Sequence, residues 1–420
     1  MSDFDIRVIA RAAREAGHVL AGAAGEKKNA ALHAMAGGLL DSRDRILVAN
    51  AEDVASAKSE GHPVAFVDRL GLTAPRLEAM ARGLRQIAEL PDPVGEITGM
   101  WRRPNGLTVG RMRVPLGVIG IVYESRPNVT ADAAGLCLKS GNAVILRGGR
   151  EALRTNAALG GILAASVASA GLPEACLAVV PTPDRSVVKE MLGLDGLIDL
   201  IIPRGGEELI RAVREGSRIP VIAHDKGLCH TYVDAGADLA MAAEIAYNAK
   251  VERPGVCNAM ETLLVHAEVA AGFLPGFVAR LAQAGVEVRG CPRTRAIVAG
   301  LRPATEEDWD TEYLDLVLSI RVVESFEEAL RHIARHGSGL AEAIVTADQA
   351  RAMRFLRAVD AGAVFVNAST RFTDGYEFGM GAEMGISTQK LHARGPMGLT
   401  ELTCQKFIVL GEGHVRDSRT

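Results

Sequence analysis

Aromatic side chains are scarce in this sequence, at 4% of its 420 residues, although hydrophobic residues make up 48%. The interior must therefore be built from Ala, Val, Leu and Ile and not from stacked rings. Charged residues account for 23%, which is ordinary for a globular protein. A chain of this length is too long for one hydrophobic core, so we expect about two to three domains.

Paired cysteines are also lacking. No two of the six cysteines form a C-x-x-C pair, and none lies close to a histidine at zinc-ligand spacing. This pattern excludes a disulfide framework and a structural metal, and it favours a reducing compartment, the cytoplasm. His332 and His336 are spaced like metal ligands on a helix. Because no acidic third ligand is evident, we expect them on a solvated helix face and predict no metal site.

The sequence has no basic stripe, no signal peptide and no apolar run typical of a membrane span. Net charge is -4, and Lys and Arg are spread along the chain, which excludes a nucleic-acid partner. The first fourteen residues carry three arginines and two aspartates, unlike a secretory signal. The longest uncharged run, 155–173, contains polar residues and three glycines. It predicts a buried helix, so we expect a soluble cytoplasmic protein with no membrane partner.

Apolar spacing predicts the order of helices and strands. Three- and four-residue spacing predicts helices over 6–20, 28–40 and 43–59. After Val114 short apolar strands alternate with helices, which is typical of parallel βαβ units in a doubly wound sheet. The expected strands of this region are 118–122, 143–146, 177–180, 197–202 and 220–223. A second α/β region begins near Thr231, with expected strands 263–265, 317–323, 343–345 and 363–366.

Two strand-like pieces, 107–109 and 403–410, have no place in either α/β region. An isolated two-stranded ribbon is marginal in water and exposes an unpaired edge. Pairing with another subunit resolves this, so we predict a homodimer or a higher oligomer. The alternative is a ribbon that packs back on its own chain.

Cys257 is the clearest candidate for a reactive residue. It follows Pro254 and Gly255, which end a helix and leave the thiol on an accessible loop. Lys250 and Arg253 are near in sequence and would favour the reactive thiolate. The alternative is a buried core cysteine, the commonest place for a cytosolic thiol.

Two glycine pairs follow strands and precede helices. Gly148 and Gly149, like Gly205 and Gly206, would present backbone N–H groups at a helix start to a nucleotide phosphate. The alternative is a plain βα turn that needs glycine. Two further residues, Arg147 and Arg150, flank the first pair. They would hold a 2′-phosphate and select NADP, unless they are a solvated charge pair.

Four segments together resemble a known family, the gamma-glutamyl phosphate reductases. They are VPLGVIGIVYESRPNVT at 114–130, KSGNAVILRGG at 139–149, RPGVCNAMET at 253–262, and the tail 380–398 with QKLHARGP at 389–396. The resemblance spans nearly the whole chain. The wider relatives are the aldehyde dehydrogenases.

The resemblance implies an aldehyde-dehydrogenase-like α/β fold with two doubly wound α/β domains and a small oligomerisation ribbon. We therefore expect a cofactor-binding domain at 1–228, with a ribbon strand near 105–114. A catalytic cysteine domain would follow at 229–395, and an oligomerisation strand and tail at 396–420.

Roles for single residues follow from the same resemblance. Cys257 matches the nucleophile, Gly205 and Gly206 the pyrophosphate site, and Glu312 the carboxylate that holds the nicotinamide ribose. Arg150 falls where NAD-using relatives often carry an acid, so NADPH is the expected cofactor.

The implied reaction is NADPH-dependent reduction of L-glutamyl 5-phosphate to glutamate 5-semialdehyde, with a separate glutamate 5-kinase supplying this small-molecule substrate. Hydrolytic relatives carry a Glu about thirty residues before the cysteine, but 220–233 contains none. Without a base that activates water, reduction is favoured over aldehyde oxidation. The rivals are an ordinary aldehyde dehydrogenase and a relative with a decayed site that acts as a structural partner.

Substrate contacts are the least defined part of the expected site. Arg126 and Arg371 are candidates for the substrate α-carboxylate. The candidates for the leaving phosphate are Lys390, His392 and Arg394, and the alternative for each of these residues is a structural role. The backbone N–H of Cys257 and the Asn128 amide would stabilise the oxyanion.

Overall fold

The computed structural model describes residues 4–224 and 226–416, which form two compact units. The first unit runs to Ala223 and includes Met380–Gly385 and the chain from Met397 onward. The second consists of His224–Gly379 and Ile386–Pro396. The expected separate segment at 396–420 is thus part of the first unit from Met397, and the first boundary lies a few residues before the expected Leu228.

A four-stranded parallel sheet lies at the centre of the first unit, in the order β5-β4-β3-β6. Its strands are β3 (Val118–Tyr123), β4 (Ala143–Gly148), β5 (Leu177–Val179) and β6 (Leu200–Arg204). Every residue of β3 is buried, as expected for a central strand covered on both faces. The expected strand at 220–223 is wrong. Only Val221 bridges to Ile201, because Pro220 has no N–H to extend the ladder.

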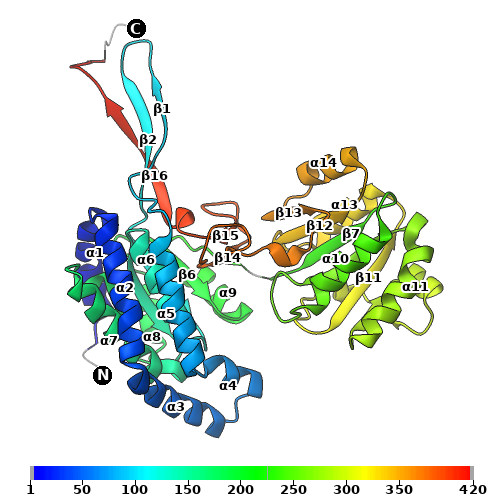
Figure 1. The fold of residues 1–420 in the computed structure, drawn as a ribbon, viewed down its shortest axis with the longest axis horizontal. Coiled ribbons are helices and arrows are strands. Elements are labelled where there is room, and N and C mark those ends of the chain that lie inside the picture. The colour runs from blue at the N-terminus through cyan, green and yellow to red at the C-terminus, as the bar shows by residue number, and fades with distance from the viewer. Residues whose placement is uncertain (1–3, 225, 417–420) are drawn as a thin grey trace. The chain divides into compact units, whose positions relative to one another are not determined.

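Nine helices of the described first unit surround this sheet (Figure 1). They are α1 (Ile6–Ala21), α2 (Gly25–Asp41), α3 (Arg43–Ser59), α4 (Val64–Leu70), α5 (Ala74–Glu89), α6 (Asn128–Lys139), α7 (Leu153–Ser169), α8 (Ser186–Met191) and α9 (Glu207–Gly216). One core cluster joins apolar residues of α1, α8 and α9 to the strands. The three expected N-terminal helices correspond to α1, α2 and α3.

Three antiparallel strands form a ribbon that extends from the first unit (Figure 1). They are β1 (Ile97–Arg102), β2 (Thr108–Pro115) and β16 (Thr403–Leu410), in the order β1-β2-β16. The expected ribbon had two strands, and β1 was missed. Trp101 and Phe407 meet edge to face on this ribbon, and Phe407 remains 61% exposed.

The second unit contains a seven-stranded sheet whose neighbouring strands all pair in parallel, in the order β10-β9-β11-β8-β7-β12-β13. Its strands are β7 (Cys229–Val233), β8 (Met260–His266), β9 (Glu287–Gly290), β10 (Arg302–Pro303), β11 (Val317–Val323), β12 (Ala341–Val345) and β13 (Ala363–Val366). A short pair, β14 (Gly385–Ser387) and β15 (Gly395–Met397), lies where the chain passes between the units.

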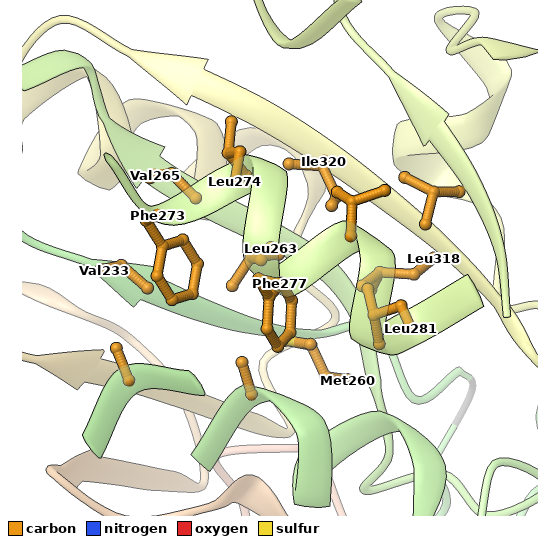
Figure 2. Close-up of a cluster of buried hydrophobic side chains, with 14 of the residues drawn as sticks. Val233, Met260, Leu263, Val265, Phe273, Leu274, Phe277, Leu281, Leu318 and Ile320 are labelled. Carbon is orange, nitrogen blue, oxygen red and sulfur yellow. The ribbon is translucent and has the colours of Figure 1, made fainter. Parts of the chain in front are cut away.

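Helices cover both faces of this second sheet because its side chains alternate between them. In β8, Leu263 and Val265 pack in the cluster with α10 (Leu239–Val251) and α11 (Ala267–Gln283), whereas Leu264 packs with α13 (Phe326–His336) and α14 (Gln349–Ala358). Figure 2 shows the first cluster, in which Phe273 and Phe277 of α11 lie against the strands. The remaining helix is α12 (Pro292–Ile297).

The predicted arrangement of two α/β regions with parallel sheets, plus a separate ribbon, is confirmed. Within the described residues, no helix has the length and apolar character needed to cross a membrane.

Candidate active site

Cys257 lies on the loop between α10 and β8, at the amino end of the second sheet. Because the strands are parallel, their amino ends meet at one edge, where Cys229 of β7 pairs in register with Met260 of β8. Cys257 is half-buried, and a turn at Pro254 and Gly255 precedes it. The sequence therefore placed the thiol correctly on a loop.

Gly227 packs directly against the backbone of Cys257. A Cβ atom added to Gly227 would lie 2.1 Å from the Cys257 carbonyl oxygen and 2.5 Å from its Cα. The Gly227 N–H donates to Glu312 Oε1 at 3.0 Å. One glycine thus joins the thiol loop to the predicted ribose carboxylate, and no other residue type fits there without displacing the loop.

Cys229 holds the same loop from the sheet. Its buried thiol donates to the Cys257 carbonyl oxygen at 3.3 Å, and burial raises the pKa of Cys229 well above its ordinary value. Cys137 and Cys176 are also buried, and burial raises the pKa of both thiols. The ribbon residue Cys404 is exposed.

Lys250 was expected to favour the Cys257 thiolate, but its ammonium is bound to another group. Its ammonium is fully buried and binds the Glu261 carboxylate at 2.6 Å. Burial lowers the pKa of Lys250 and raises that of Glu261 to about 7. The positive charge of Lys250 is therefore neutralised within the pair.

Arg371 is tied to the residue that follows the candidate nucleophile. It lies in a short 3₁₀ turn (Thr370–Phe372) and binds the Asn258 side-chain oxygen and the Glu252 carboxylate, the latter at 2.7 Å. The Asn258 amide donates back to the Thr373 carbonyl oxygen at 2.9 Å. Arg371 thus lies beside the thiol loop.

Lys390 has different binding partners from Arg371. It pairs with Asp360 at 2.6 Å, and the same carboxylate binds Arg394 at 2.6 Å. Lys390 and Arg394 therefore share one carboxylate, and within the described residues no ion pair or hydrogen bond joins Lys390 to the thiol loop.

The first unit holds the predicted glycines of the cofactor site at the carboxyl ends of its parallel strands. Gly148 ends β4, and Gly205 and Gly206 lie between β6 and α9. A Cβ on Gly148 would lie 2.0 Å from Asn156 Nδ2, and a Cβ on Gly205 would lie 2.4 Å from Glu124 Oε2. A larger residue at either position would therefore have to displace a neighbouring side chain, and the start of α9 faces this edge. A ligand is expected at such an edge in an open α/β sheet.

Glu124 is an unexpected neighbour of the predicted pyrophosphate site. Its carboxylate accepts the Gly206 N–H at 2.9 Å, in the position that a bound anion would take at the start of α9. A dinucleotide phosphate must displace this carboxylate to reach the same amide.

The two arginines of the first glycine loop differ. Arg147 is buried and donates to the carbonyl oxygens of Gly148 and Pro183 at 3.1 and 3.0 Å. Arg150 is exposed and pairs with Glu60 at 3.1 Å. Arg150 is therefore the more accessible cation for a phosphate ligand.

Asn128 is the first residue of α6 and is exposed, as is Arg126 just before it. The Asn128 amide donates to Asp132 one turn later, at 3.2 Å. Burial raises the pKa of Asp132 to about 6, against the opposing effects of Asn128 and of the Arg204 charge. Asp132 thus fixes the direction of the amide proposed for the oxyanion.

Comparison with known proteins agrees with this arrangement. The aldehyde dehydrogenase family matches residues 2–300 and 297–407. A gamma-glutamyl phosphate reductase of Moorella thermoacetica is 57% identical over 412 residues, 98% of this chain and 99% of that protein. The crystal structure of the gamma-glutamyl phosphate reductase of Thermotoga maritima superposes with a TM-score of 0.97 at 48% identity, covering 99% of this chain and 100% of that one. The chain belongs to the gamma-glutamyl phosphate reductases of the aldehyde dehydrogenase family.

Membership of this family confirms the predicted resemblance and makes the chain an enzyme with a nicotinamide cofactor. The glycine positions and the start of α9 fit a dinucleotide, provided that Glu124 moves from the Gly206 amide.

The expectation of a solvated face for His332 and His336 is wrong. Both are buried, their rings lie 4.6 Å apart, and His336 Nδ1 contacts Asp310 at 2.7 Å. Burial, together with the charges of neighbouring histidines, lowers the pKa of His332 to about 2. Trp309 packs on His332, so these histidines belong to the interior of the reductase.

Sequence reasoning missed Gly227, Glu124, Asp132 and the partners Asn258 and Glu261. Asn258 and Glu261 stood inside the segment that carried the resemblance, yet nothing in the sequence paired them with distant groups. Gly227 is a lone glycine within Lys226-Gly227-Leu228, with no turn signal around it.

Proposed function

We propose that the chain reduces L-glutamyl 5-phosphate to L-glutamate 5-semialdehyde and phosphate, using NADPH and a thioester at Cys257. This reaction is a step of proline biosynthesis. The observation that carries the proposal is the Cys257 loop, held by Gly227 and Cys229, in a chain 57% identical to a gamma-glutamyl phosphate reductase.

The thiolate of Cys257 attacks the γ-carbonyl carbon, a C–S bond forms, and the C–O bond to phosphate breaks. The Cys257 N–H and the Asn128 amide stabilise the oxyanion in this step. A nicotinamide cofactor held by Gly205, Gly206 and Glu312 would supply hydride to the thioester carbon. The C–S bond then breaks, which releases the aldehyde and restores the thiolate. The lack of a glutamate at 220–233 protects the thioester from activated water.

The exposed Arg150 supports selection of NADPH, because a guanidinium binds a 2′-phosphate well. Arg147 shapes the loop through its backbone contacts, and Gly148 and Gly149 let the chain approach the ligand. Gly205 and Gly206 receive the pyrophosphate, and Glu312 holds the nicotinamide ribose.

For the substrate, Arg371 is the better supported of the two carboxylate ligands, since it contacts the neighbour of Cys257. Arg126 and Lys390 remain assigned to the substrate carboxylate and to phosphate. A separate glutamate 5-kinase supplies the substrate in the cytoplasm.

The ribbon supports a homodimer or higher oligomer, because it exposes Trp101, Phe407 and Val409. These three side chains give the ribbon an apolar surface suited to a second copy of the chain.

The decisive experiment compares wild type with Cys257→Ala. In the forward direction, with glutamyl phosphate as substrate, wild type should oxidise NADPH faster than it oxidises NADH. In the reverse direction, wild type should oxidise the semialdehyde only when phosphate is present. Folded Cys257→Ala should show neither activity. Phosphate-independent oxidation of the semialdehyde would instead identify an ordinary aldehyde dehydrogenase. Retained turnover in the variant would exclude the thioester mechanism.

A further inference from the structure

A buried ion pair brackets the candidate thiol loop. Lys250 lies one residue before the end of α10, and Glu261 is the second residue of β8. Their side chains are 0% and 1% exposed, and the Lys250 Nζ and Glu261 Oε2 atoms are 2.6 Å apart. A buried pair of this kind contributes little stability beyond that of well-packed apolar residues of similar size. Its position therefore invites an explanation other than stability.

The pair also holds the loop that carries Glu312. Glu261 Oε1 accepts the backbone N–H of Leu314 at 3.2 Å, and the Lys250 ammonium lies 5.9 Å from the centre of the Tyr313 ring. Leu314 has a φ of 53°, in the left-handed region that residues other than glycine rarely adopt. The buried pair thus holds Leu314 in a strained conformation, and its ammonium lies near the Tyr313 ring.

Two further contacts join the Cys257 loop to the Glu312 loop. A Cβ on Gly255 of the thiol loop would lie 3.7 Å from the Leu314 carbonyl oxygen, so the loops are adjacent. On the other side, Gly227 contacts the Cys257 backbone and donates to Glu312. A shift of one loop must therefore be transmitted to the other.

We propose that Lys250 and Glu261 are positioning residues that keep the Cys257 loop and the Glu312 loop in one register. The proposal rests on the proposed function, in which Cys257 is the nucleophile and Glu312 holds the ribose of the cofactor. Neither Lys250 nor Glu261 touches the substrate. They act through the geometry of the two loops, and their loss should change catalysis more than stability.

The test replaces the pair with apolar residues of similar shape, Lys250→Met with Glu261→Leu, which leaves no unpaired charge in the interior. Glu261→Gln serves as a second variant, because its amide oxygen still accepts the Leu314 N–H. Arg280→Met with Glu244→Gln is the matched control, since it removes an exposed ion pair between α10 and α11. Melting temperature, kcat and the KM for NADPH are measured on each full-length protein.

The rate at which iodoacetamide labels Cys257 is a further readout that simple destabilisation does not change. It is measured in a Cys404→Ser background, because Cys404 is exposed and would also react. The double variant should melt close to wild type yet lose about tenfold or more in kcat, because loop shifts below 1 Å are costly. Its KM for NADPH should rise and its labelling rate should change. The kcat, the KM for NADPH and the labelling rate of Glu261→Gln should lie between those of the double variant and wild type. The same quantities in the control should match wild type.

Wild-type kcat, KM and labelling rate in a folded double variant would overturn the proposal. If the double variant does not fold, Glu261→Gln decides, and wild-type kinetics in that variant would overturn it equally. Failure of the proposed function is recognised separately. In that case Cys257→Ala retains activity, whereas failure of the positioning role alone leaves Cys257→Ala inactive.

Discussion

Replacing Gly227 with alanine should impair catalysis through the thiol loop. The added Cβ would lie 2.1 Å from the Cys257 carbonyl oxygen, whereas ordinary van der Waals contacts begin at 3.4 Å. The neighbouring atoms belong to the backbone, so no flexible side chain can move away, and the Cys257 loop must shift by about 1 Å. A misplacement of this size can cost about 10²-fold in rate, and overpacking costs about 1–3 kcal/mol of stability.

The assay is NADPH oxidation with glutamyl phosphate, together with a melting curve. Gly255→Ala is the matched control, because it adds the same methyl group to the thiol loop where the nearest atom is 3.7 Å away. We expect Gly227→Ala to remain folded, to lose kcat, and to raise the KM for NADPH through its bond to Glu312. Wild-type turnover in folded Gly227→Ala, or an equal loss in the control, would refute the reasoning.

Three further predictions concern the first unit. Asp132→Asn should raise the free energy of unfolding at pH 8 by up to about 3 kcal/mol. Burial raises the pKa of Asp132 from 3.8 to about 6, so wild type loses stability as the pH rises from the first of these values to the second. The gain should fade as the pH falls toward 4, and equal gains in urea titrations at pH 8 and pH 4.5 would contradict this. Arg150→Glu should shift the kcat/KM preference from NADPH toward NADH, because a carboxylate repels the 2′-phosphate; unchanged preference would remove Arg150 from the cofactor site. Deleting the chain from Thr403 should give a monomer or insoluble protein by light scattering, and an unchanged oligomeric mass would exclude the ribbon interface.

Regular repeats of apolar residues were sufficient to predict much of the fold. The spacing in α1 to α3 and the alternation of β3, β4 and β5 with helices follow from local burial, which the sequence displays directly. The missed strand β1 is exposed along most of its length, so it has no buried stripe to detect. The wrong strand at 220–223 depended on a partner ladder, which local pattern does not reveal.

For the candidate site too, features set by neighbouring residues were predictable and contacts between distant residues were not. The position of Cys257 on a loop could be predicted because the residues that break the helix, Pro254 and Gly255, are its neighbours in sequence. Lys250 was misjudged because its partner Glu261 lies eleven residues away across a loop, and both are buried. The contact of Gly227 with Cys257 joins positions thirty residues apart, and no local pattern predicts it.

The division of the chain into units has a consequence for synthesis on the ribosome. The buried cluster that packs against Cys257 includes Cys229, Leu340 and Ile386, so its last member is made well after Cys257. A nascent chain that ends at residue 379 contains the thiol but lacks part of its apolar support. Cys257 thus reaches its final environment only near the end of translation, after most of the protein has been synthesised.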